Sequence, residues 1–211
     1  MDIFVRIYWL IISFFSGTSS DDVINAHIII ISQFLLFFVV VFSQITDILK
    51  YHHVWGGSIN YIADKIGDHI IWGFDSFEGL PEGWLPGYQQ GKFNENGNLP
   101  AVNDNVRLVK GWFHETLPKF MEAHKSEPCS FINIDCDLYS STKCVLSLLK
   151  DNIRKGTVIC FDELAGQIGW QDDEYKALTE FAEETGLKFK YIACAFGGGH
   201  QLTERVAIEI L

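Results

Sequence analysis

Four acidic residues stand where two apolar runs end, and carboxylates in such positions can do chemistry. Each pair follows its run directly: Asp135 and Asp137 after residues 130–134, and Asp162 and Glu163 after residues 157–161. Carboxylate oxygens are the ligands that hard cations such as Mg²⁺ prefer, and zinc favours softer donors. A carboxylate within hydrogen-bond reach of a hydroxyl can also remove its proton. The spacing therefore indicates a metal and base site, and the alternative is four solvated acids at strand ends.

The segment between the two runs must bring these acids together. It has a helical pattern and then a Lys155-Gly156 turn, which is the length that a parallel strand–helix–strand crossover needs. Both strands then point the same way, and their carboxyl ends meet at the sheet edge where open α/β sheets bind ligands. Asp135 and Asp137 are two residues apart and face the same side of an extended chain, so one can hold a metal while the other faces a substrate.

The rest of the chain from Tyr51 onward alternates between the two element types. Expected strands cover 69–74, 106–112, 188–196 and 204–211, and expected helices cover 59–66, 115–124 and 172–185. The glycines at 197–199 predict an antiparallel pair of strands at the carboxyl-terminal edge of the sheet. The pattern predicts a Rossmann-like α/β fold with a mostly parallel sheet and helices on both faces. The loop 76–105 is rich in Gly, Pro and Asn, and loops of this length are often functional lids.

Two weaker motifs suggest a nucleotide-like ligand. Asp75 and Ser76 follow an expected strand, and an acid in this position typically accepts hydrogen bonds from ribose hydroxyls. Gly57 and Ser58 precede a helix, where glycine lets the backbone approach a ligand closely. We expect these four residues to contact a cofactor.

Composition narrows the class of protein. The 211 residues suggest one domain, and 27 acidic against 16 basic residues give a net charge of -11. A general nucleic-acid binder would need a basic face, so this charge argues against one. Small molecules or cations fit better as partners.

The first fifty residues are unusually apolar. Residues 26–45 contain no charged side chain, and their length suits a transmembrane helix. We expect residues 1–50 to form apolar helices, either as a membrane anchor or as a segment foreign to the fold, and residues 51–211 to form the working domain. The domain would then be cytoplasmic, with or without this anchor.

Five blocks in order resemble the macrocin O-methyltransferase family, which comprises class I, S-adenosylmethionine-dependent, metal-dependent enzymes. The blocks are GFDSFEGLPEGW (73–84), KGWFHETLP (110–118), FINIDCDLYSSTK (131–143), GTVICFDE (156–163) and WQDDEYKAL (170–178). The resemblance implies S-adenosylmethionine and Mg²⁺ as cofactors. The roles that it implies are metal binding by Asp135, Asp162 and Glu163, proton abstraction by Asp137, ribose binding by Asp75, and contact with the adenine end by Gly111 and Trp112.

The sequence departs from the family pattern in the first strand. Tyr51 stands where the family has an acid, and His53 stands where it has a glycine. Three functions therefore stay open. The first is O-methyl transfer to a hydroxyl of a sugar or phenol type of acceptor, in a chain that can also form a homo-oligomer. The second is a non-catalytic methyltransferase-like domain with a degraded cofactor motif, tethered to a membrane. The third, which the acids alone permit, is a hydrolase of phosphate esters.

Overall fold

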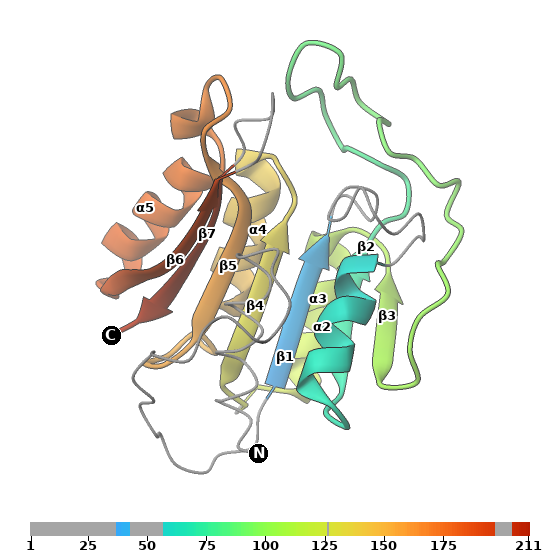
Figure 1. The fold of residues 1–211 in the computed structure, drawn as a ribbon, viewed down its shortest axis with the longest axis horizontal. Coiled ribbons are helices and arrows are strands. Elements are labelled where there is room, and N and C mark those ends of the chain that lie inside the picture. Colours follow the sequence, from blue (N-terminus) through green and yellow to red (C-terminus); the bar gives the residue numbers. More distant parts are fainter. Residues whose placement is uncertain (1–36, 43–56, 126, 197–203) are drawn as a thin grey trace.

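The computed structural model describes residues 37–42, 57–125, 127–196 and 204–211, and this part of the chain is built around one twisted sheet (Figure 1). The strands are β1 (Phe37–Phe42), β2 (Ile71–Asp75), β3 (Val106–Lys110), β4 (Cys129–Asp135), β5 (Val158–Ala165), β6 (Phe189–Phe196) and β7 (Glu204–Ile210). The helices are α2 (Gly57–Ile66), α3 (Phe113–Ala123), α4 (Tyr139–Leu149) and α5 (Glu174–Thr185), with a short 3₁₀ turn η1 (Trp170–Asp172).

The strand order is β3-β2-β1-β4-β5-β7-β6. The pairs from β3 to β5 are all parallel, whereas β7 lies antiparallel between β5 and β6. The predicted parallel sheet with an antiparallel carboxyl-terminal pair is therefore confirmed. The switch between β1 and β4, where the strand order reverses, is where ligands of such sheets bind.

Helices cover both faces of the sheet (Figure 1). Helix α2 packs its apolar side, including Ile59 and Ile62, on one face together with Cys160 of β5. Helices α3, α4 and α5 pack on the other face, where the neighbours of Cys160 along β5, Ile159 and Phe161, point. Successive strand residues point to opposite faces, so apolar residues on both sides of β5 follow from its burial under two helix layers.

The apolar amino-terminal region contains the largest difference from expectation. Residues Phe37–Phe42 form β1, which lies in the middle of the sheet between β2 and β4. A helix through 26–45 is therefore wrong for these six residues, and the predicted apolar helices are not supported. A strand buried on both faces reads as a continuous apolar run, as a membrane helix does. In the described ranges, no helix is both long and apolar enough to cross a membrane.

The boundary expected at residue 50 does not separate the sheet from the amino-terminal segment, because a central strand comes from upstream of it. Other boundaries shift by a few residues, which is the usual uncertainty at element ends. Ser58 lies inside α2 instead of preceding it. The end of α5 agrees with expectation, since Gly186 takes the left-handed conformation that closes a helix.

Candidate active site

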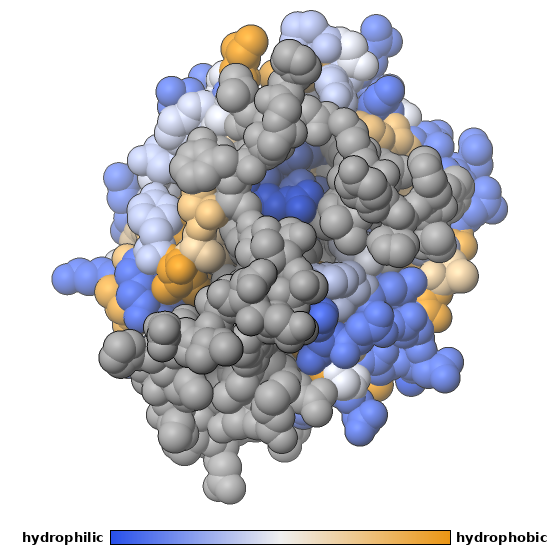
Figure 2. Space-filling view, viewed as in Figure 1, coloured by the Kyte–Doolittle hydropathy of each residue, from blue (hydrophilic) through white to orange (hydrophobic). Residues whose placement is uncertain are grey.

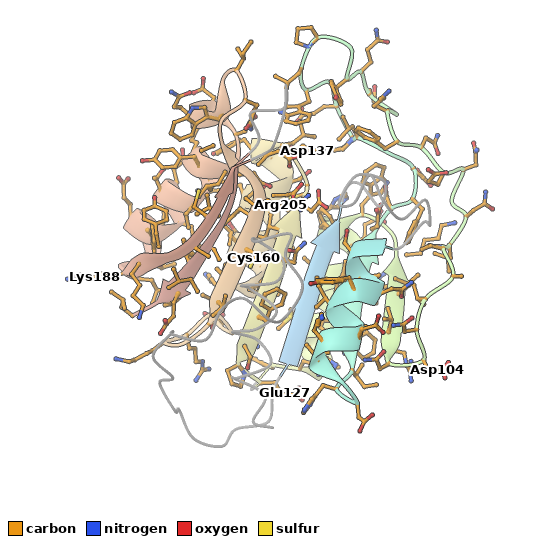
Figure 3. The ribbon with its side chains drawn as sticks, viewed as in Figure 1. Asp104, Glu127, Asp137, Cys160, Lys188 and Arg205 are labelled. Atoms are coloured by element: carbon orange, nitrogen blue, oxygen red, sulfur yellow. The ribbon has the colours of Figure 1, made fainter. Side chains whose placement is uncertain are left out.

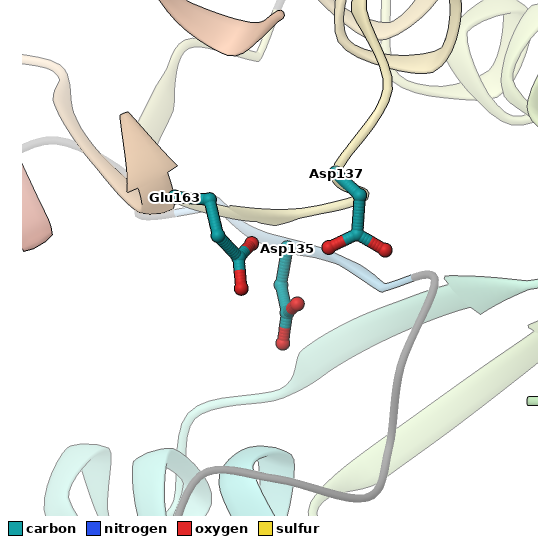
Figure 4. Close-up of side chains that lie close together, drawn as sticks. All are labelled: Asp135, Asp137 and Glu163. Carbon is teal, nitrogen blue, oxygen red and sulfur yellow. The ribbon is translucent and has the colours of Figure 1, made fainter. Parts of the chain in front are cut away.

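Three carboxylates converge at the carboxyl edge of the sheet. One oxygen each from Asp135, Asp137 and Glu163 lies within 4.8 Å of the other two, and all three residues are buried. Figure 4 shows the three side chains projecting to the same side, so that their carboxylate groups lie close together. The prediction that parallel strands would deliver these acids to one place is confirmed for these three.

Strand β5 pairs irregularly with β7 at the position of its two consecutive acids. Phe161 pairs with Val206 of β7, but the next paired residue of β5 is Ala165, which pairs with Glu204. Three residues of β5 thus stand opposite one residue of β7, which is a bulge. Bulges re-aim side chains that regular alternation would send to opposite faces. Asp162 and Glu163 are the first two residues of this bulge.

Asp137 is placed by a strained turn. Its φ of 56° lies in the left-handed region, which is uncommon for residues other than glycine, and it is fully buried. The turn is closed by the Leu138 N–H, which donates to the Cys136 carbonyl at 2.5 Å. Backbone strain of this kind clusters at functional sites, where the surrounding structure holds it in place. Helix α4 begins directly afterwards, at Tyr139.

Glu174 is a fifth acid of the site, and the sequence reasoning missed it. It opens α5 and is fully buried, although it carries a carboxyl group. Its Oε2 accepts a hydrogen bond from the Glu163 N–H at 3.2 Å, and its carboxylate also accepts from the backbone of Cys136. Glu174 therefore ties together the ends of β4 and β5. Its place in the block 170–178 was the signal that could have found it.

Burial and mutual repulsion perturb these acids strongly. Loss of solvation raises the pKa of Asp135, Glu163 and Glu174 well above the ordinary range, and the neighbouring carboxylates raise it further. Among the described residues, the Glu163 Oε2 atom has no hydrogen-bond partner. A buried carboxylate oxygen without a donor, beside two others, is what a hard cation would satisfy. The residues present therefore fit the metal that the resemblance implies.

Asp162 has a different environment from the other three predicted acids. Its Oδ1 forms an ion pair with the Arg205 Nε of β7, and the two side chains are 12% and 22% exposed. Asp137 and Arg205 lie near each other at the upper ends of the strands in Figure 3, and Figure 2 shows strongly hydrophilic residues in this part of the same face. The roles predicted for Asp135, Asp162 and Glu163 as metal ligands and for Asp137 as base stay predictions.

Asp75 lies at the end of β2, on the same edge of the sheet. Its Oδ1 accepts from the Phe77 N–H at 2.7 Å, and the residue is only 6% exposed. Desolvation raises the pKa of Asp75 to about 7, although hydrogen bonds from the backbone lower it in part. The neighbouring Ser76 is also buried, and its hydroxyl accepts from the Glu78 N–H.

The region after β3 completes this part of the site. The Gly111 N–H donates to the Asp75 carbonyl at 2.9 Å, and the φ of Gly111 is 138°. A Cβ at Gly111 would lie 2.8 Å from the Thr116 methyl group, so a side chain at this position would be strained. Trp112 precedes α3 without a side-chain cap and lines both a narrow space beside Asp75 and a cavity of about 820 Å³.

Gly57 and Ser58, the other residues that we expected to contact a cofactor, lie at the start of α2. Gly57 begins α2, and a Cβ there would meet no atom of the described chain within 4 Å. Ser58 is buried in the first turn of the helix. Tyr51 and His53, which depart from the family pattern, lie outside the described residues.

Solved structures resemble this fold. The calicheamicin methyltransferase CalS11 superposes with a TM-score of 0.58 at 19% identity, covering 82% of this chain and 71% of that one. The O-methyltransferase NovP gives a TM-score of 0.52 at 18% identity, with coverage of 82% and 71%. Similarity at this identity concerns the fold, which is the class I methyltransferase type of mixed α/β sheet.

Curated relatives are similar over a shorter span. Demethyldecarbamoylnovobiocin O-methyltransferase of Streptomyces niveus is 26% identical over 142 residues, covering 58% of this chain and 53% of the relative. The 8-demethyl-8-(2,3-dimethoxy-alpha-L-rhamnosyl)-tetracenomycin-C 4'-O-methyltransferase of Streptomyces olivaceus is 28% identical over 136 residues, with coverage of 53% and 51%. The chain thus spans about half the length of these relatives.

The family assignment rests on a longer match. The sequence profile described as Macrocin-O-methyltransferase (TylF) matches residues 54–192, which is well over half of the chain. This range contains Asp75, Trp112 and all five acids of the site, so the resemblance inferred from the sequence blocks is confirmed. The chain belongs to the macrocin O-methyltransferase family.

Proposed function

We propose that this chain transfers a methyl group from S-adenosylmethionine to a hydroxyl of a small molecule of sugar or phenol type, with the help of a divalent cation. The observation that carries the proposal is the convergence of Asp135, Asp137 and Glu163 at the carboxyl edge of the sheet in a member of this family. Both curated relatives are named as O-methyltransferases, which supports the reaction type.

The proposed donor, S-adenosylmethionine, carries its methyl group on a positively charged sulfur, and this charge makes the methyl carbon a strong electrophile. Asp75 is the proposed partner of the ribose hydroxyls, and its position at the end of β2 supports this role because acids in this position typically bind ribose. Trp112 lines the space beside Asp75 and offers an aromatic face to a purine. Gly111 and Ser76 shape the backbone around the same space, and Gly57 and Ser58 open α2 at the same edge.

Asp137 is the proposed general base. A carboxylate oxygen of Asp137 takes the proton of the acceptor hydroxyl, and the acceptor oxygen then forms a bond to the methyl carbon. S-adenosylmethionine held beside Asp75 and Trp112 would supply the methyl group, and its sulfur would keep the electron pair of the broken carbon–sulfur bond. The strained turn and the buried position of Asp137 fix the direction from which the proton is taken.

Asp135 and Glu163, with Asp162 as the further predicted ligand, would hold the cation. Mg²⁺ bound there would lower the pKa of the acceptor hydroxyl and stabilise the oxyanion. Glu174 holds the backbone of Cys136 and Glu163 and so fixes the spacing of the ligands.

Label transfer from methyl-labelled S-adenosylmethionine to a panel of sugar and phenol hydroxyls tests this proposal. We expect transfer by the wild type, lowered by EDTA, and a loss of about 100-fold or more in Asp137→Asn, the usual size of a general-base effect. Asp172→Asn, an exposed acid of η1, is the matched control and should keep its activity. Transfer that is unaffected by Asp137→Asn would contradict the assigned base.

The alternative of a non-catalytic, membrane-tethered domain depends on Tyr51 and His53, and it predicts a folded chain that binds no S-adenosylmethionine. Metal-dependent phosphate release in place of methyl transfer would favour the hydrolase alternative. Neither the described residues nor the family match offers an observation that favours these two.

A further inference from the structure

Arg205 is the charged residue at this site that the proposed reaction does not use. It is the second residue of β7 and stands opposite the three-residue bulge of β5 that carries Asp162 and Glu163. Its guanidinium pairs with the Asp162 carboxylate through Nε, in a partly buried position. An arginine in the strand next to a set of metal-binding acids is unexpected, because its charge and that of a metal ion repel each other.

The positive charge of Arg205 reaches beyond its direct partner. It lowers the pKa of Asp135, in opposition to burial and to the charges of Asp162 and Asp137, which raise it. Arginine keeps its charge at any pH at which proteins fold, so this counter-ion is permanently present. Part of the repulsion among the buried acids is therefore offset by a side chain of the protein itself.

Asp162 cannot easily satisfy two cations at once. Its Oδ1 is engaged by Arg205, whereas the oxygens of Asp135, Asp137 and Glu163 gather within 4.8 Å of one another without it. A divalent ion among those oxygens would place its charge near the guanidinium in a site of low exposure, where charge–charge interactions are strong. The Glu163 Oε2 atom, buried and without a hydrogen-bond partner in the described chain, is independent evidence that this arrangement suits a cation.

We propose that Arg205 is a built-in competitor of the metal: it occupies Asp162 and lowers the affinity of the acid site for divalent cations. The metal-free site is then held together by the Arg205–Asp162 pair, and metal binding through Asp162 requires this pair to open. The inference rests on the metal site of the proposed function. The inference adds to the proposed function a residue that sets the cation concentration at which the acid site fills.

Mn²⁺ binding to the full chain, followed by electron paramagnetic resonance, tests the inference without any acceptor. Arg205→Met and Arg205→Gln remove the charge, and Arg205→Lys keeps it as the matched control. We expect both neutral variants to bind Mn²⁺ about tenfold or more tightly than the wild type, which corresponds to about 1.4 kcal/mol or more. Arg205→Lys should stay within about threefold of the wild type, a difference of about 0.6 kcal/mol.

Equal or weaker Mn²⁺ binding by the neutral variants would overturn the inference, and so would the absence of binding in all four proteins. If the neutral variants are unfolded without metal, the test still decides, because Mn²⁺ should then restore the circular dichroism spectrum of the folded protein. Failure of Mn²⁺ to restore it would overturn the inference as well. S-adenosylmethionine binding, measured by calorimetry in the same samples, tests the proposed function separately.

Discussion

Replacing the buried Asp75 by asparagine should change how the stability of the protein depends on pH. Burial raises the pKa of Asp75 from 3.8 to about 7, and the charge of Glu95 contributes in the same direction. The unfolded chain therefore releases this proton near pH 4, whereas the folded chain keeps it until about pH 7. The stability linked to this group is fully present below its unfolded pKa and is lost as the pH rises through the folded pKa.

The size of the effect follows from the same values. A tenfold change in an equilibrium constant corresponds to about 1.4 kcal/mol, so raising the pKa from 3.8 to about 7 destabilises the fold by about 4 kcal/mol above pH 7. The asparagine side chain cannot ionise, and its carbonyl can still accept from the Phe77 N–H. We expect Asp75→Asn to match the wild type near pH 4 and to exceed its free energy of unfolding by up to about 4 kcal/mol at pH 7.5.

Equilibrium unfolding in urea from pH 4 to pH 8, without S-adenosylmethionine, measures this difference. Subtracting the two curves removes the contributions of the other buried acids, which both proteins share. Asp104→Asn removes a carboxyl at an exposed position and controls for the change in net charge. A difference between Asp75→Asn and the wild type that stays flat within about 1 kcal/mol across this range would refute the reasoning.

Three further substitutions, one of them with a matched control, test the scaffold. Gly79→Ala should destabilise the fold by more than about 2 kcal/mol, because its φ is 79° and the new Cβ would lie 2.2 Å from a backbone oxygen. Gly87→Ala is its control: φ is 89° there, but no atom of the described chain lies within 4 Å of the new Cβ, so the expected loss of stability is only about 1 kcal/mol. Urea unfolding measures both losses. Thr157→Val should lower the free energy of unfolding by about 1 to 3 kcal/mol, because its buried hydroxyl donates to a backbone carbonyl at 2.6 Å; a neutral result would mean that water replaces it. Trp84→Phe removes the 3.0 Å hydrogen bond from the indole to Asp173, and it should speed proteolysis in the loop between β2 and β3; unchanged cleavage would show that this bond does not hold the loop.

Much of the fold could be predicted because each signal was local. Alternating strand and helix patterns, with glycines at the breaks, were enough to order the elements from β2 to β7. The parallel crossover from β4 to β5 then required Asp135 and Glu163 to meet at one edge, and they do. Reasoning of this kind works where a fold has one way to connect two neighbouring strands.

The wrong prediction of an amino-terminal helix has a physical cause that cannot be recognised in a single sequence. Residues Phe37–Phe42 are all apolar in sequence, as residues of a central strand usually are, and periodicity cannot separate such a strand from part of a membrane helix. The consecutive valines at 39–41 were the signal for a strand, because β-branched residues favour sheets. A truncation at residue 51 would remove this strand, so experiments should use the full chain.

Contacts between residues far apart in the sequence could not be predicted from the sequence either. The bulge that aims Asp162 and Glu163 depends on the register between β5 and β7, which no local pattern specifies. Glu174 carries the helical spacing of an ordinary surface acid and is buried only because α5 docks beside the ends of β4 and β5. Arg205 lies 43 residues from its partner Asp162 and belongs to a strand with no motif of its own.

Calorimetric titration of the full chain with S-adenosylmethionine, with and without Mg²⁺, tests whether this protein binds the methyl donor that its proposed function requires. We expect saturable binding to one site per chain. A chain that is folded by circular dichroism and releases no heat under either condition would contradict it, and would leave a domain that keeps the fold of its family without its chemistry.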